Sequence, residues 1–142
     1  MPQEFSAGLI AFRKAETVKF LLLKYPKGYF SFSRGAIEQG EDSRAAAIRE
    51  FKEETNLEPL KVFDGFKELV GLFYRKEGKI IHKDITFYLA EAKEGEVKLT
   101  EHSDFGWFTF DEAMEKLQFK NDKDLLKKAE EFLKKYYEGE SL

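Results

Sequence analysis

The stretch REFKEET, residues 49–55, places three glutamates within five positions of a predicted helix. Glu50 and Glu54 are four residues apart and Glu53 lies beside them, so the three carboxylates form a stripe along the border between core and solvent. Like charges at this spacing cost roughly 0.2–0.5 kcal/mol per pair on an exposed helix. The C-terminal end of a helix also disfavours negative charge. A compensating positive charge is therefore expected.

Two sources of positive charge can compensate these acids. Arg49 can pair with Glu53 four residues on, but one guanidinium does not balance three carboxylates. A divalent cation would, and a set of oxygen ligands without His or Cys favours Mg²⁺ or Mn²⁺. The alternative is an ordinary solvated acidic face, with ion pairs to Arg49 and Lys52 within the helix.

The helix that carries the acids is predicted from about residue 43 to residue 56. Asp42 or Ser43 is a suitable N-cap, and the three alanines that follow favour a helix. Asn56 suits the left-handed conformation that ends a helix, because Asn is the usual substitute for Gly there. Both ends of the acidic helix are therefore marked in the sequence.

Strands, hairpins and helices follow one another along the rest of the chain. Residues 31–42, which contain two glycines, are expected to form a loop. The mixture indicates an α+β or layered α/β/α domain and not a doubly wound nucleotide-binding fold. Strands are predicted at residues 4–13, 17–25, 66–75, 80–92 and 104–110, and further helices at 111–117 and 122–137.

The composition limits the class of protein. The chain has 142 residues, 42 % of them hydrophobic, which fits one globular domain over residues 1–142. A net charge of −3 leaves no general basic field for binding nucleic acid. The absence of cysteine excludes disulfides and thiolate metal sites. No signal-like N-terminus and no apolar run near ~20 residues is present, so we expect a cytoplasmic protein with no membrane partner.

The acidic helix belongs to a longer pattern, GAIEQGEDSRAAAIREFKEETNL, residues 35–57. Gly35 is followed after five residues by Glu41, and seven more residues lead to the Arg-Glu pair at 49–50. An apolar residue, any residue, two glutamates, any residue, Asn56 and an apolar residue complete it. This pattern resembles the signature of the Nudix hydrolases, which cleave a nucleoside diphosphate linked to another group. Asn56 is the one departure, since the family has Gly there, and Asn tolerates the same backbone.

The resemblance implies a fold, a cofactor and a reaction. The fold would be an α/β/α sandwich around a mixed β-sheet, with a loop–helix–loop motif that holds Mg²⁺. The reaction would be attack of water on a phosphorus of a phosphoanhydride. Carried over position by position, the principal metal ligands are Glu50 and Glu54, a further ligand is Glu53, the orienting cation is Arg49, and the loop-shaping residues are Gly35 and Glu41.

The segment TEHSDFGW, residues 100–107, resembles part of one Nudix subfamily, the diadenosine tetraphosphate hydrolases. On that match Glu101 would be a metal ligand or the general base; its alternative is an ordinary loop acid. His102 would either touch the substrate or be a hydrogen-bonded structural residue. Phe105 stands where the subfamily has Tyr, so the hydrogen bond of that hydroxyl is absent.

Four further residues are matched to substrate binding. Lys83 aligns with a lysine of the subfamily that binds the polyphosphate. Arg34 lies in YFSFSRG, where the family usually reads Phe-Pro-Lys-Gly, and it keeps the charge and can bind phosphate in a bidentate manner. Ser33 replaces the proline of that pattern, which makes the loop less rigid. Tyr29 and Tyr74 are candidate platforms for base stacking, with ordinary packing as the alternative.

The sequence is compatible with four functions. The first is Mg²⁺-dependent hydrolysis of dinucleoside polyphosphates, with diadenosine tetraphosphate split asymmetrically to ATP and AMP. The second is another Nudix activity, on RNA 5′-triphosphate ends, damaged nucleoside triphosphates or nucleotide sugars. The third is a non-catalytic nucleotide-binding module, which would be marked by loss of motif acids; all of them are present. The fourth is a structural acidic helix with no site.

Overall fold

The computed structural model describes residues 2–140 of the chain. Within these residues eight strands form one mixed sheet, and three helices accompany it. In chain order the elements are β1 (Gln3–Lys14), β2 (Val18–Lys24), β3 (Phe30–Ser31), β4 (Ser33–Ala36), α1 (Ser43–Thr55), β5 (Pro59–Val62), β6 (Glu68–Lys76), β7 (Lys79–Ala92), β8 (Asp104–Phe108), α2 (Phe110–Lys116) and α3 (Lys120–Glu140).

Strand β1 is the centre of the sheet. It runs parallel to β7, with Gln3 opposite His82 and Phe12 opposite Glu91, and antiparallel to both β2 and β4. The path of neighbouring strands is β3-β2-β1-β7-β5, while β4 pairs with β1, β6 with β7 and β8 with β2. Successive β1 side chains point to opposite faces, and both faces are buried, as expected for a strand covered on two sides.

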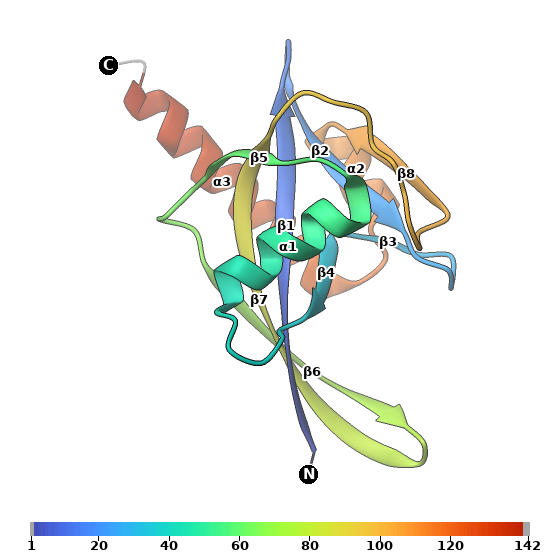
Figure 1. Ribbon diagram of the computed structural model, residues 1–142. Helices are drawn as coiled ribbons and strands as arrows, with labels where there is room; N and C mark the ends of the chain where they lie inside the picture. The colour runs from blue at the N-terminus through green and yellow to red at the C-terminus, as the bar shows by residue number, and fades with distance from the viewer. Residues whose placement is uncertain (1, 141–142) are drawn as a thin grey trace.

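Helices cover the two faces of this sheet. On one face Phe51 of α1 joins a buried cluster with Leu9 of β1 and Leu21 of β2. On the other face α2 and α3 join a second cluster, in which Leu126 lies with Phe12. Figure 1 shows α1 in front of the strands and α3 behind them. The architecture is an α/β/α sandwich around a mixed sheet, so the expected fold class is confirmed.

The β6–β7 hairpin extends away from the body of the sheet, beside the first residues of β1 (Figure 1). Its outward side chains alternate with inward ones, as the period of two in a strand requires. The inward series includes Leu72, Tyr74 and Lys83, which line a cavity. None of the helices within residues 2–140 has the length and apolar character needed to cross a membrane.

The expected long strands and helices are present, but three short strands were missed. The expectation of a loop over residues 31–42 is wrong for Ser33–Ala36, which forms β4 and pairs with Ser6–Leu9 of β1. Strands β3 and β5 were also absent from the expectation. The sequence SRGA has no alternation of apolar residues, and its strand conformation depends on hydrogen bonds to a segment about 27 residues earlier. Local pattern therefore carries no signal for β4.

Candidate functional site

Helix α1 is fixed at both ends as the sequence predicted. The side chain of Asp42 accepts a hydrogen bond from the N–H of Ala45 at 2.7 Å and caps the N-terminus. Asn56 adopts the left-handed conformation with φ 63°, and its N–H donates to the carbonyl of Lys52 at 2.8 Å. The helix register is thereby set, and with it the direction of the three acidic side chains.

The three glutamates of α1 differ in burial. Glu54 is only 8 % exposed, Glu50 is half-buried, and Glu53 is exposed. The expected stripe along the edge of the core therefore exists, but Glu54 lies deeper than an edge position. Its Oε1 accepts a hydrogen bond from the Oγ of Ser33 at 2.6 Å. Burial raises the pKa of Glu54 to about 7, against the effect of the Ser33 hydrogen bond.

Glu50 lies against Gly35 of β4. A Cβ at position 35 would overlap the carboxylate of Glu50, so only glycine allows this approach. Burial is the largest influence on Glu50 and raises its pKa, while the nearby Arg49 lowers it. The charge of Glu50 in turn raises the pKa of Glu54, which means that the two carboxylates are close enough to repel each other.

Arg49 joins the acids to the loop before the helix. Its Nε and Nη2 donate to the two carboxylate oxygens of Glu41 at 2.7 and 3.0 Å, a bidentate pair. Its Nη1 donates to Glu50 at 3.0 Å and forms an ion pair with Glu53 at 3.3 Å. The hydrogen bond from Arg49 lowers the pKa of Glu41. The expected ion pairs of Arg49 are confirmed, and they hold Glu41 and Glu50 around one guanidinium.

Glu101 and His102 approach the same carboxylates from the segment that precedes β8. Glu101 is exposed, and its negative charge adds to the factors that raise the pKa of Glu50 and of Glu54. The Nε2 of His102 lies 3.7 Å from Oε2 of Glu54, and its ring meets the ring of Tyr25 edge-on at 4.4 Å. Burial lowers the pKa of His102, which keeps the imidazole neutral at pH 7.

A cavity of about 720 Å³ opens beside β4, between the β6–β7 hairpin and the start of α3. Its volume is in the range of small-molecule sites. Three of its lining residues carry positive charge and none carries negative charge. Burial lowers the pKa of Lys83, and the charge of Arg34 lowers it further, so the two cations are close together. The lining residues are Lys27, Tyr29, Arg34, Leu72, Tyr74, Lys83, Ile85, Phe119 and Asn121.

Aromatic rings form part of the same cavity. Tyr29 stacks on Tyr25 with ring centroids 5.1 Å apart and meets Phe119 edge-on at 5.0 Å. Phe119 is 48 % exposed, so a flat apolar surface faces the cavity. Tyr74, another lining residue, donates its hydroxyl to Glu4, which restricts the orientation of its ring. These rings offer faces on which a base can stack.

Strand β4 connects the acids and the cavity. Ser33 contacts Glu54, Gly35 makes room for Glu50, and Arg34 between them lines the cavity. This alternation follows from the period of two in a strand. One strand therefore brings an oxygen-rich cluster and a cationic, aromatic cavity to adjoining positions.

Two of the expected substrate-binding residues do not line this cavity. His102 lies beside Glu54, with its Nε2 3.7 Å from the carboxylate. Phe105 of β8 lines a different hollow with Arg13 and Trp107, where the guanidinium of Arg13 lies 4.1 Å from the centre of the indole ring. By contrast, Tyr29, Arg34, Tyr74 and Lys83 converge on the cavity.

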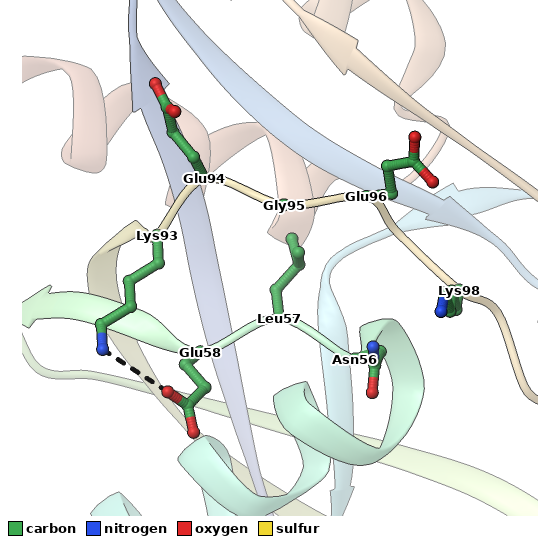
Figure 2. A pocket seen from close by; sticks show the side chains of 8 residues that line it. All are labelled: Asn56, Leu57, Glu58, Lys93, Glu94, Gly95, Glu96 and Lys98. Carbon is green, nitrogen blue, oxygen red and sulfur yellow. Dashed lines mark hydrogen bonds and ion pairs between the residues drawn. The ribbon is translucent and has the colours of Figure 1, made fainter.

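Another hollow, of about 380 Å³, lies at the C-terminal end of α1 (Figure 2). Figure 2 shows Asn56 and Leu57 on one side and Gly95 on the other, with an ion pair between Lys93 and Glu58 at 3.5 Å. Its rim carries charges of both signs. The acids of α1 do not line it, so it is separate from the cluster described above.

Several residues of the site were not found from sequence. Ser33 was noted only for the missing proline, although a hydroxyl beside a motif glutamate is a possible donor. Phe119 and Asn121 come from the junction of α2 and α3, which is brought to the cavity by the fold. Lys27 lies in the loop PKGYF and was not among the expected site residues, although its positive charge was an available signal.

The acidic cluster offers carboxylate oxygens, the ligands that Mg²⁺ and Mn²⁺ prefer. Across residues 2–140, no group of three or more His, Asp or Glu side chains is already arranged to hold a metal ion. Glu50 and Glu54 nevertheless repel each other, and burial raises the pKa of both. A cation between such carboxylates would favour their ionised forms, so the donor set fits a divalent metal.

Comparison with known proteins places these observations in a family. The NUDIX domain family model matches residues 3–129. The asymmetrical bis(5′-nucleosyl)-tetraphosphatase of Caenorhabditis elegans is 35 % identical, over 90 % of this chain and 95 % of that protein. The enzyme of the same name from Rattus norvegicus is 32 % identical, over 90 % of this chain and 94 % of that protein.

Solved structures agree with this placement. A crystal structure of a C. elegans Ap4A hydrolase binary complex superposes with a TM-score of 0.81 and 33 % identity, over 92 % of this chain and 97 % of that one. The Escherichia coli dihydroneopterin triphosphate pyrophosphohydrolase has a TM-score of 0.71 at 16 % identity, which shows a shared fold alone. The resemblance drawn from the motif at residues 35–57 is confirmed. The chain belongs to the NUDIX domain family.

Proposed function

We propose that this protein hydrolyses a phosphoanhydride bond of dinucleoside polyphosphates, splitting diadenosine tetraphosphate asymmetrically to ATP and AMP. The observation that carries the proposal is the role of β4. Ser33 and Gly35 contact the motif carboxylates, and Arg34 between them lines a cavity with Lys27 and Lys83. The names of the relatives at 32–35 % identity support the choice of substrate.

The metal of the proposed reaction is Mg²⁺, with Mn²⁺ as a substitute. Glu50 and Glu54 would hold it, with Glu53 and Glu101 as further ligands, because all four offer carboxylate oxygens around one region of α1. A divalent cation bound there lowers the pKa of a water molecule and offsets the charge of the phosphates.

The residues of the chain supply the remaining functions. Arg49 holds Glu41 and Glu50 in place through its ion pairs. One carboxylate among Glu53, Glu54 and Glu101 accepts the proton of the attacking water. Glu41 and Glu50 are therefore held in position by Arg49, while the proton acceptor is one of Glu53, Glu54 and Glu101.

The cavity is the proposed place for the polyphosphate and a base. Arg34, Lys27 and Lys83 would neutralise the phosphates, and Arg34 can do so in a bidentate manner. Tyr29 and Tyr74, with Phe119, would stack against the base. His102 and Phe105 are left out of this set because neither lines the cavity.

Product analysis tests the proposal. Purified protein with Mg²⁺ is given diadenosine tetraphosphate, and the products are separated by ion-exchange chromatography. Glu54→Gln is assayed in parallel, with Glu131→Gln, an exposed acid of α3, as the matched control. We expect ATP and AMP from the wild type and the control, and little turnover by Glu54→Gln. Two molecules of ADP, or no cleavage, would contradict the asymmetrical assignment. Cleavage of nucleoside triphosphates, nucleotide sugars or triphosphorylated RNA instead would assign the protein to another Nudix activity.

A further inference from the structure

We propose that Asp122 is a positioning residue: through Ser31 it holds the guanidinium of Arg34 toward the cavity in the orientation that receives the polyphosphate. The inference rests on the proposed function for the identity of the polyphosphate. Asp122 lies in the first turn of α3 and does not itself line the cavity. It would therefore act through Arg34, without touching the substrate.

The contacts form a chain from α3 to β4. The Oγ of Ser31, on β3, donates to Oδ2 of Asp122 at 2.8 Å. Nη1 of Arg34 donates in turn to the same Oγ, at 3.5 Å. A hydroxyl has one proton to donate and lone pairs to accept with. Because Asp122 takes the proton of Ser31, the lone pairs of that hydroxyl are turned toward Arg34.

The burial of this chain makes its geometry specific. Ser31 is 0 % exposed and Asp122 is 4 % exposed. A buried carboxyl without a partner is costly, and no lysine or arginine of residues 2–140 forms an ion pair with Asp122 at contact distance. Burial raises the pKa of Asp122; the hydrogen bond from Ser31 and, among the described cations, the charge of Arg34 lower it. Ser31 and Arg34 are thus the groups that offset the burial of Asp122.

Arg34 needs such an anchor because the cavity side repels it. Lys83 lines the same cavity, and the two positive charges act on each other. On its other sides Arg34 contacts neutral groups: its Nη2 donates to the hydroxyl of Tyr29 at 3.3 Å, and its guanidinium lies 5.2 Å from the ring centre of Tyr25. Asp122 supplies the negative charge behind this arrangement. Without it, the direct side-chain contacts that hold Arg34 against repulsion from Lys83 are, within residues 2–140, those with Tyr25, Tyr29 and Ser31, all of them neutral.

Asp122 also has an ordinary structural role, from which the positioning role must be separated. An acid in the first turn of a helix is favoured by the helix dipole. Asp124 lies two residues further along α3, where it is paired with Lys120 at 2.8 Å, and it forms no hydrogen bond or ion pair with Arg34 or Ser31 within residues 2–140. Asp124→Asn is therefore a matched control, because it changes the charge near the helix start and leaves the Ser31 contact intact.

A double-mutant cycle tests the proposal with ATP as the probe, by calorimetric titration in the presence of Mg²⁺. The variants are Asp122→Asn, Arg34→Ala, their combination and Asp124→Asn. We expect Asp122→Asn to weaken ATP binding about three- to tenfold in the wild-type background and less than about twofold when Arg34 is already removed. Asp124→Asn should bind ATP as the wild type does. For diadenosine tetraphosphate, Asp122→Asn should raise KM by a similar factor and change kcat less than about twofold.

Ser31→Ala is the second variant, in case Asp122→Asn fails to fold. It removes the hydroxyl that links Asp122 to Arg34. Its effect on ATP binding should likewise be smaller when Arg34 is already replaced by alanine. NMR relaxation of the side-chain N–H groups of Arg34, in ¹⁵N-arginine-labelled protein, gives a readout that needs no substrate. The Arg34 side chain should become more mobile in Asp122→Asn and should not in Asp124→Asn.

Several outcomes would overturn the inference. Equal weakening of ATP binding with and without Arg34 would show that Asp122 acts on folding alone. Unchanged ATP binding and unchanged Arg34 resonances in Asp122→Asn would show that Asp122 does not position Arg34. A wild type that binds no ATP would contradict a polyphosphate site at Arg34, and the inference would fall with it. If the cycle behaves as expected but diadenosine tetraphosphate is not cleaved, the positioning role stands and the proposed substrate falls.

Discussion

The hydroxyl of Ser33 donates a 2.6 Å hydrogen bond to Oε1 of Glu54, and both side chains are buried. A proline, the usual residue of the family pattern at this position, has no side-chain donor. The bond favours the ionised form of Glu54, while burial favours the protonated form. Ser33 therefore makes the proposed metal ligand more available as an anion than burial alone would allow.

Ser33→Ala should weaken Mg²⁺ binding about three- to tenfold at pH 7, because Glu54 loses a hydrogen bond to its ionised form. Calorimetric titration with Mg²⁺ measures the change. Ser103→Ala, at an exposed position before β8, is the control and should bind Mg²⁺ as the wild type does. An unchanged affinity in Ser33→Ala would mean that the hydroxyl has no part in holding the metal.

Gly35→Ala should lower kcat on diadenosine tetraphosphate about tenfold or more, because the added Cβ overlaps the carboxylate of Glu50 and must displace it. Gly139→Ala, on α3, is the control, since a Cβ there meets nothing within 4 Å. Steady-state kinetics and a thermal melt are measured for both variants. Full activity of a folded Gly35→Ala would show that Glu50 can move without consequence.

Without metal, the free energy of unfolding should fall as the pH rises from about 4.5 to about 7. The folded-state pKa of Glu54, about 7, lies above its ordinary value of 4.5, so folding favours the protonated carboxyl. The protonated carboxyl of Glu54 contributes about 3 kcal/mol to the free energy of unfolding. This contribution is fully present below pH 4.5 and is lost as the pH rises through 7. Asp122, whose pKa burial also raises, adds a trend of the same sign.

Glu54→Gln isolates the part due to Glu54, because the amide cannot ionise and still accepts from Ser33. Urea unfolding with EDTA, from pH 4 to pH 8, should give a flatter stability profile for the variant than for the wild type. The variant should be the more stable of the two at pH 8. Parallel profiles would mean that Glu54 is ionised in the folded protein well below pH 7.

Asn56→Ala should destabilise the protein by about 1–2 kcal/mol, because Asn56 is left-handed and alanine pays the full steric cost of that conformation. Asn56→Gly should cost little or stabilise slightly, since glycine adopts the conformation freely. Urea unfolding of the two variants provides a matched comparison at one position. Equal stability of the two would show that the helix end relaxes to a right-handed conformation when Asn is replaced.

The features predicted from sequence are those with local causes. The acidic helix, its Asp42 cap and its Asn56 end depend on residues within a few positions of one another, and all three were confirmed. The resemblance of the motif to a known family supplied the fold class. It also selected Arg34 and Lys83, which lie 49 positions apart in the sequence and share a cavity.

The features that were missed depend on contacts between distant segments. Strand β4 exists because β1 pairs with it. Ser31 and Asp122 are 91 positions apart, and nothing near either residue marks the hydrogen bond between them. Phe105 is directed to the hollow with Arg13 by the register of β8 on β2, which a sequence segment does not specify.

Steady-state kinetics of diadenosine tetraphosphate hydrolysis by Glu54→Gln and Arg34→Ala, measured with Mg²⁺ at pH 7, test whether β4 joins the motif acids to a phosphate-binding cavity. We expect the two variants to change different kinetic parameters. Glu54→Gln should lower kcat on the order of 10²–10³-fold with little change in KM. Arg34→Ala should raise KM about tenfold or more with a smaller effect on kcat. Near-normal kcat in Glu54→Gln, or an unchanged KM in Arg34→Ala, would contradict a site in which β4 joins the motif acids to a phosphate-binding cavity.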